Sequence, residues 1–76
     1  MQVKAIIDAV KDLKGLTNYG IAKALRDRGI DITSQGIDGY AKGTGRVRLD
    51  VLCGLNELIG KGWNYTGKLI EGEMRK

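Results

Sequence analysis

The sequence predicts an all-α fold, a compact bundle of four to five short helices, and three observations support this. Apolar residues recur at three- and four-residue spacing along most of the chain, which is the period of an amphipathic helix. Glycine follows most of these stretches, and glycine commonly ends a helix. The alternation typical of a strand occurs only at "IDITS", residues 30–34, which is short and has no pairing partner, so we expect a long turn there.

The first two helices are predicted from their apolar faces and their ends. Residues 2–14 carry one apolar stripe that ends at Gly15, and the stripe consists of Val3, Ile6, Ile7, Val10 and Leu13. Thr17 is a good N-cap for a second helix, which runs to about Arg28 and stops at Gly29. The second helix has an apolar face and a basic face, made of Ile21, Ala22 and Leu25 on one side and Lys23, Arg26 and Arg28 on the other.

Two more helices follow, and the last segment is open to two interpretations. Thr33 provides an N-cap for a short third helix from Ser34 to Lys42, closed by Gly43. The fourth helix is predicted from Leu49 to Ile59, before Gly60, on the apolar positions Leu49, Leu52, Leu55, Leu58 and Ile59. Residues 61–76 form either a fifth short helix or an extended arm. We find no internal repeat, low-complexity run or interdomain linker, so residues 1–76 are expected to be one domain.

Length and composition exclude several classes of protein. A core from 76 residues supplies only about 3 to 5 kcal/mol, and chains this short usually gain support from disulfides, a metal or a partner. The single Cys53, which we expect to be a small core residue, cannot form an internal disulfide. Without histidine, zinc ligand sets and the commonest general acid or base are missing. We therefore expect no metal, no cofactor and no enzymatic activity, with self-association as the support.

The distribution of charge points to a location and to a partner. Charged residues interrupt the start of the chain, so it is neither a membrane span nor a signal peptide, and we predict a cytoplasmic protein. Thirteen Lys and Arg against nine Asp and Glu give a net charge of +4 and a pI near 9.4, in the range of nucleic-acid binders. Three positive charges and no acid occur in "KGTGRVR", residues 42–48, directly after the glycine-containing "ITSQGIDGYA", residues 32–41.

Residues 16–60 resemble the lambda-repressor-like helix-turn-helix family, also called the Cro/repressor or XRE type. In that family a leucine and a threonine precede a helix with an apolar residue and alanine in succession, as do Leu16, Thr17, Ile21 and Ala22. The family's second helix has an apolar residue, Ser or Thr, Ile, an aromatic residue and a closing glycine, matched by Ile32, Thr33, Ile37, Tyr40 and Gly43. The next helix often begins Leu-Asp-x-Leu and ends at glycine, matched by Leu49, Asp50, Leu52 and Gly60.

This resemblance implies a sequence-specific regulator of transcription that binds double-stranded DNA as a homodimer, such as a phage or prophage repressor or a Cro-like protein. We expect no membrane partner, and no small-molecule substrate is evident from the sequence. The chain also departs from the family's pattern. The connection within "RDRGIDITS" is longer than the family's tight turn, and Gly20 stands where a glutamate commonly completes a capping box. Gly36 and Gly39 occupy positions where the family presents base-contacting or supporting side chains.

In a helix that lies in the major groove, side chains near the N-terminus touch base edges. Direct base contacts are therefore expected from Ser34, Gln35 and Asp38. Glycine in a helix interior costs about 1 kcal/mol relative to alanine. Gly36 and Gly39 either let the backbone approach the DNA closely or accommodate packing against a neighbouring helix.

Phosphate contacts and the dimer contact are also implied. Exposed amides at a helix start favour an anion, and the loop after the third helix is basic. The expected phosphate contacts are Asn18, Tyr19, Thr33, Lys42, Thr44, Arg46 and Arg48. The aromatic and apolar residues after the fourth helix are expected in the core or in the dimer interface, for which we select Trp63, Tyr65 and Leu69.

Three rival functions are weighed against DNA reading. A helix-turn-helix module can serve protein–protein interaction instead, for example in an antitoxin or a regulator-binding adaptor, because a fold alone does not fix function. "GWNYTGKL" is a near miss for a phosphate-binding loop, but Leu69 replaces the required hydroxyl and too little chain follows for a parallel sheet. "GIDG" satisfies the GxxG pattern of KH-type RNA binders, but the flanking strands of that fold are missing.

Overall fold

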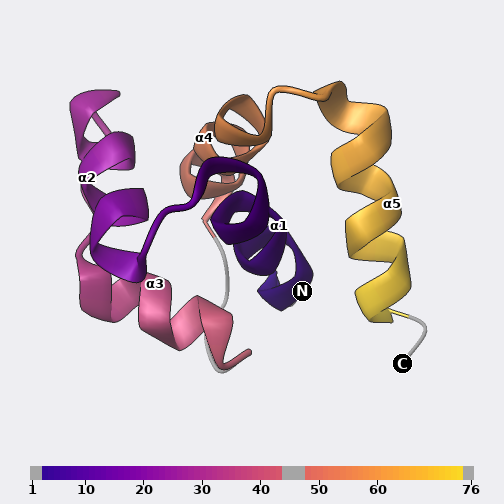
Figure 1. Ribbon diagram of the computed structural model, residues 1–76, viewed down its shortest axis with the longest axis horizontal. Helices are drawn as coiled ribbons and strands as arrows, with labels where there is room; N and C mark the ends of the chain where they lie inside the picture. Colours follow the sequence, from indigo (N-terminus) through magenta and orange to yellow (C-terminus); the bar gives the residue numbers. More distant parts are fainter. Residues whose placement is uncertain (1–2, 44–47, 75–76) are drawn as a thin grey trace.

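The computed structural model describes residues 3–43 and 48–74, with the backbone alone for residues 73 and 74. This part of the chain contains five α-helices and no strand (Figure 1). The helices are α1 (Lys4–Lys14), α2 (Asn18–Asp27), α3 (Ser34–Ala41), α4 (Leu49–Ile59) and α5 (Gly62–Met74). The predicted all-helical class is confirmed, and residues 30–33 form the expected connection between α2 and α3. The last segment is a helix, so the alternative of an extended arm is wrong.

Side-chain caps and glycines set most helix ends, as the sequence predicts. Thr17 Oγ1 accepts a hydrogen bond from the backbone N–H of Gly20, and Thr33 Oγ1 accepts one from Gly36, each at 3.2 Å. Gly15 and Gly60 end α1 and α4 in the left-handed conformation, with φ of 65° and 72°. The predicted α4 bounds are correct. The helices α1, α2 and α3 are slightly shorter than predicted, because Val3, Arg28 and Lys42 are capping residues just outside them.

The starts of α2 and α3 share one local design at their N-caps. "LTNYGI" (residues 16–21) and "ITSQGI" (residues 32–37) share threonine, glycine and isoleucine at equivalent positions. A Cβ on Gly20 would lie 3.2 Å from Leu16 Cδ2, and a Cβ on Gly36 would lie 3.2 Å from Ile32 Cγ1. At both starts, glycine leaves room for an apolar residue in the position of a hydrophobic staple.

The helices enclose one apolar core around α1. Figure 1 shows α2 and α3 at one end of the long axis and α5 at the other, with α1 between them. The helix α1 packs against α3, α4 and α5, and α2 packs against α3 and α4. The largest fully buried apolar side chains of the core are Val3, Ile6, Ile7, Val10, Ile21, Leu25, Ile37, Val51 and Leu55. Burial of this apolar area is the main favourable contribution to folding.

Two close contacts fix α4 relative to its neighbours. Gly54 faces α2, where an added Cβ would lie only 2.6 Å from Leu25 Cδ2 and from Ile30 Cδ1. On the other side, the fully buried Thr66 of α5 donates its hydroxyl to Asn56 Oδ1 of α4 at 2.6 Å.

No helix within the described ranges has the length and apolar character that crossing a membrane requires. Position 53 is a partly buried free thiol.

Candidate nucleic-acid interface

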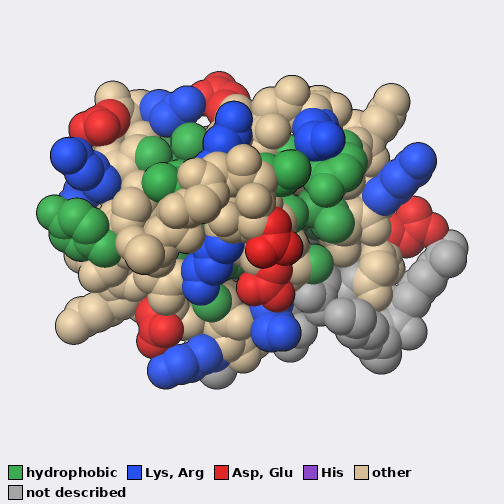
Figure 2. Space-filling view, viewed as in Figure 1, with side chains coloured by type: hydrophobic (Ala, Val, Ile, Leu, Met, Phe, Trp, Pro, Cys, Tyr) green, Lys and Arg blue, Asp and Glu red, His purple; other side chains and the backbone are tan. Residues whose placement is uncertain are grey.

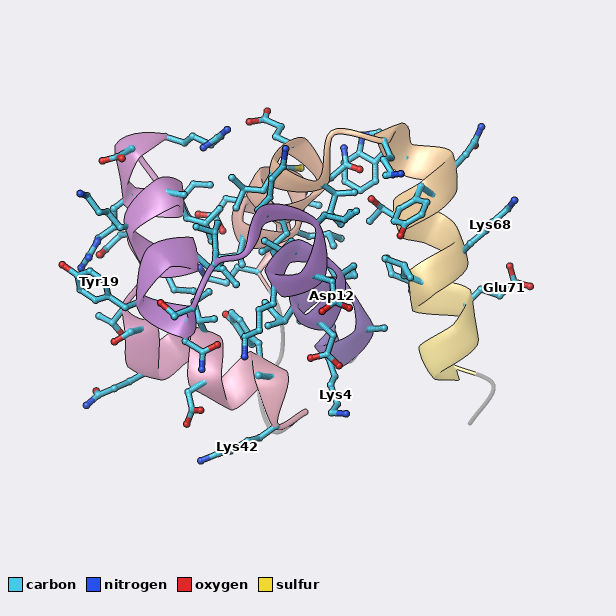
Figure 3. The ribbon with its side chains drawn as sticks, viewed as in Figure 1. Lys4, Asp12, Tyr19, Lys42, Lys68 and Glu71 are labelled. Atoms are coloured by element: carbon cyan, nitrogen blue, oxygen red, sulfur yellow. The ribbon has the colours of Figure 1, made fainter. Side chains whose placement is uncertain are left out.

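The helix α3 buries one side and presents a polar stripe on the other. Ile37 is fully buried and anchors the helix to the core. Because successive residues turn by about 100° around a helix axis, Gln35, Gly39 and Lys42 lie on the side opposite to Ile37. Gln35 and Lys42 are exposed, and Gly39 is half-buried. The side chain of Lys42 projects away from the body of the molecule (Figure 3). This polar stripe is therefore open to a partner.

The carboxylate of Asp38 joins two other residues from the predicted site. Asn18 Nδ2, in the first turn of α2, donates to Asp38 Oδ1 at 3.3 Å. Lys42 Nζ lies 2.9 Å from Asp38 Oδ2, one helical turn away on α3. The expected base contact at Asp38 and the expected phosphate contacts at Asn18 and Lys42 therefore form one cluster. The Asn18–Asp38 bond also ties the start of α2 to the middle of α3.

The side chain of Asn18 is held in one orientation. Its Oδ1 atom is buried, and no described residue donates a hydrogen bond to it. Rotation of the amide by half a turn would place this oxygen, instead of the donating nitrogen, against the carboxylate of Asp38. The orientation therefore depends on the Asp38 carboxylate.

The basic stretch after α3 is less free than its sequence indicates. Arg48 Nε lies 3.2 Å from Asp50 Oδ1, and Arg48 Nη2 donates to the backbone oxygen of Asp31. Lys42 is paired with Asp38. Two of the three cations in "KGTGRVR" are thus engaged with acceptors outside that stretch. The predicted phosphate contacts Thr44 and Arg46 lie outside the described residues.

The outer face of α2 carries Tyr19, an expected phosphate contact, and two cations that were not among the expected contacts. Tyr19 is 63% exposed and points away from the body of the molecule (Figure 3). Lys23 and Arg26 follow on the same face at four and seven residues' distance, both are exposed, and neither forms an ion pair with a described residue. Figure 2 shows hydrophobic and basic side chains next to one another over α2. The i, i+4, i+7 spacing in the sequence is the signal that could have found this stripe.

Gly36 does not belong to the outermost stripe of α3. It lies on the flank of the helix and faces a hollow there. The hollow has a volume of about 320 Å³ and is lined by Asp31, Ile32, Thr33, Gly36, Tyr40 and Arg48. The space that a side chain at Gly36 would need is beside Ile32, in the same chain segment. This geometry favours a packing role for Gly36, because the absence of a side chain at Gly36 leaves room for Ile32. Gly39, on the outer stripe, stays a candidate for close approach to DNA.

The expected dimer residues of α5 divide into two groups. Tyr65 and Leu69 are half-buried and pack against the core. Trp63 is 51% exposed, and Leu13 of the neighbouring α1 is 42% exposed. Figure 2 shows hydrophobic side chains gathered where α4 leads into α5, at the opposite end of the molecule from α2. Trp63 is therefore the α5 residue with the most apolar surface available to a second copy.

Comparison of the chain with protein-family models, with curated proteins and with solved structures found no match.

Proposed function

We propose that this protein is a sequence-specific regulator of transcription that binds double-stranded DNA through α3, as its resemblance to lambda-repressor-like helix-turn-helix domains implies. The observation that carries the proposal is the placement of α3. Ile37 anchors the apolar side of α3 in the core, and the polar side of α3 is exposed. The hydrogen bond from Asn18 to Asp38 joins the start of α2 to the middle of α3. In a helix-turn-helix, the second helix lies in the major groove while the first crosses the backbone.

Under this proposal the polar residues of α3 contact base edges. Gln35 is the outermost of the three expected readers, and glutamine can pair in a bidentate manner with adenine. Ser34 and Asp38 lie on the flank towards α2, where serine can contact several bases and a carboxylate can accept from cytosine. The backbone of the duplex is held by Asn18, Tyr19, Thr33, Lys42 and Arg48, and by the cations of α2.

In the proposed mode of action, the protein is a cytoplasmic homodimer that uses no cofactor and catalyses no reaction. It would act in the manner of a phage or prophage repressor or a Cro-like protein. Trp63 supplies the apolar contact between the two copies. This pairing leaves α2 and α3 free, because they lie at the opposite end of the molecule (Figure 1). A dimer of this kind recognises a near-palindromic site with half-sites about 34 Å apart, one turn of duplex.

The test is a salt titration of duplex binding with two charge-matched double variants. The logarithm of the affinity falls linearly with the logarithm of the salt concentration, and we call the steepness of this fall the salt slope. Each cation that neutralises a phosphate adds about 0.9 to the salt slope. We expect wild-type protein to bind a random-sequence duplex at low salt and to release it steeply as salt rises. The variant Lys23→Ala with Arg26→Ala should lower the slope by about 1.8, since two contacts are lost. The matched variant Lys61→Ala with Lys68→Ala removes the same charge from the α5 end and should leave the slope unchanged.

Two outcomes would contradict the proposal. Equal salt slopes for the two double variants would mean that Lys23 and Arg26 of α2 contact phosphates no more than Lys61 and Lys68 do. Absence of any salt-sensitive binding by the wild-type protein would favour the rival function, a module for protein–protein interaction. The exposed apolar residues that such a module would offer are Leu13, Tyr19, Leu49 and Trp63.

A further inference from the structure

Asp38 occupies an unusual position on a surface proposed to meet phosphates, because it adds a negative charge to it. Its carboxylate is shared between two partners, with Oδ1 accepting from Asn18 and Oδ2 paired with Lys42. Both partners are expected phosphate contacts. In the free protein, Asp38 therefore competes with DNA for the groups that would hold the DNA backbone.

The pair between Asp38 and Lys42 is easily exchanged. The side chains of Lys42 and Asp38 are 68% and 48% exposed. Exposed ion pairs contribute little to stability, because water and salt screen them. A competing donor can therefore take the carboxylate without unfolding α3, provided that it reaches the same place on the surface.

The major groove offers donors of the required kind at some bases only. The N4 amino group of cytosine and the N6 amino group of adenine donate hydrogen bonds there, whereas guanine and thymine present acceptors. A carboxylate that meets an acceptor, or a phosphate, is repelled. Repulsion of wrong partners is an established source of specificity.

We infer that Asp38 is a specificity-determining residue that holds Lys42 away from the DNA backbone until a base amino group takes the carboxylate. This inference rests on the proposed DNA-reading function. On a random duplex, the charge of Asp38 repels the nearby phosphate and keeps Lys42 paired, so Lys42 contributes no phosphate contact. On a site with a cytosine or adenine amino group at the right place, Asp38 accepts from the base and Lys42 is released to a phosphate. The carboxylate of Asp38 thereby couples the reading of a base to the binding of a DNA phosphate by Lys42.

The decisive variant is Asp38→Asn, with Asp12→Asn as its matched control. Asparagine keeps an acceptor for Asn18 Nδ2 but loses the charge that holds Lys42. Asp12 is an exposed residue of α1 on a different part of the surface (Figure 3), and its substitution changes the net charge equally. On random duplex, Asp38→Asn should raise the salt slope by about 0.9, because Lys42 is released. Asp12→Asn should leave the slope unchanged.

The variant Lys42→Ala completes a double-mutant cycle that isolates the coupling between the two residues. On random duplex it should leave the wild-type slope unchanged, because Lys42 is paired there. In the Asp38→Asn background it should return the slope to the wild-type value. Circular dichroism of each variant verifies that the helices are retained.

A second readout uses a duplex enriched from a random pool by the wild-type protein. The wild-type slope should be higher by about 0.9 on this duplex than on random duplex, since Lys42 joins the phosphate contacts. With Asp38→Asn this difference should vanish, and the ratio of affinities for enriched and random duplex should fall about tenfold. The wild-type comparison needs no variant, so it tests the inference even where a variant fails to fold.

Three results would overturn the inference while leaving the proposed function standing. They are identical slopes for Asp38→Asn and Asp12→Asn, an equal effect of Lys42→Ala in both backgrounds, and equal wild-type slopes on enriched and random duplex. If wild-type protein binds no duplex at any salt concentration, the proposed function fails and this inference fails with it.

Discussion

At the scale of single residues, glycine serves three different purposes in this chain. Gly15 and Gly60 adopt the left-handed conformation that ends a helix. Gly36 makes room for the apolar residue before its own helix, as Gly20 does. Gly54 allows α4 to approach Leu25 and Ile30 closely. Only the last purpose joins two elements that are distant in the sequence.

We expect Gly54→Ala to destabilise the protein although alanine is the better helix former. The new methyl group would lie 2.6 Å from Leu25 Cδ2, and Leu25 is fully buried, so it has no free space to move into. Overpacking of a core typically costs about 1 to 3 kcal/mol, and the gain in helix propensity is about 1 kcal/mol. Urea denaturation should therefore show a loss of about 1 kcal/mol in the free energy of unfolding.

Gly67→Ala is the matched control for Gly54→Ala. It also lies inside a helix, but nothing stands within 4 Å of its added Cβ. Its free energy of unfolding should rise by up to about 1 kcal/mol. A gain in stability for both variants would show that α4 and α2 are not in close contact at Gly54.

Residue-level prediction from the sequence succeeded for local features and failed for contacts between elements. The prediction treated "KGTGRVR" as free of acids, although Asp38 stands four residues before Lys42 and could have been recognised as its partner. The bond from Arg48 to Asp31, by contrast, joins residues 17 positions apart and has no local signal. Gly54 was missed for the same reason, because a helical pattern does not say which neighbour a face will meet.

At the scale of elements, the two threonine caps explain why helix starts could be predicted. Each Thr side chain bonds to a backbone N–H three residues on, so the signal lies within four residues of sequence. The helix α5 was harder to predict, since it contains Gly62, Gly67 and Gly72 and few apolar residues. It is positioned by the packing of Tyr65 and Leu69 against the core and by the hydrogen bond between Thr66 and Asn56, and these contacts join different helices.

Removal of the cap of α3 should weaken the proposed interface along with the fold. We expect Thr33→Ala to lower the free energy of unfolding by about 1 kcal/mol, because the N–H of Gly36 loses its acceptor. Thr33→Ser keeps the hydroxyl and should retain most of the stability. Thermal denaturation followed by circular dichroism measures both. Equal melting temperatures for the alanine variant and the wild type would mean that the cap contributes nothing.

At the scale of the whole molecule, the proposed DNA surface and the exposed Trp63 lie at opposite ends. The backbone measures 31 × 25 × 22 Å, with α2 and α3 at one end of the long axis and α5 at the other (Figure 1). Two copies that meet at α5 would have one α3 on each side of the contact. Because one copy is 31 Å long, copies that meet at α5 bring their two α3 helices to the required separation of about 34 Å only if their long axes are inclined to one another.

The variant Trp63→Ala should shift a dimer towards the monomer. Large aromatic side chains at the centre of an interface commonly dominate its affinity, and Trp63 is half-exposed in the single chain. Tyr19→Ala, at the other end of the molecule, removes a comparably exposed aromatic residue and should leave association unchanged. Sedimentation equilibrium distinguishes the two. A wild-type protein that stays monomeric at high concentration, both with and without DNA, would refute the proposed dimer.

The most direct test of DNA reading by α3 is selection of bound duplexes from a random pool with the purified protein. We predict enrichment of a near-palindromic sequence whose half-sites are about one helical turn apart. The combined variant Ser34→Ala with Gln35→Ala should lose that enrichment while keeping its salt-dependent affinity for random duplex. Recovery of the unselected pool, with no sequence enriched by the wild-type protein, would contradict sequence-specific reading by α3.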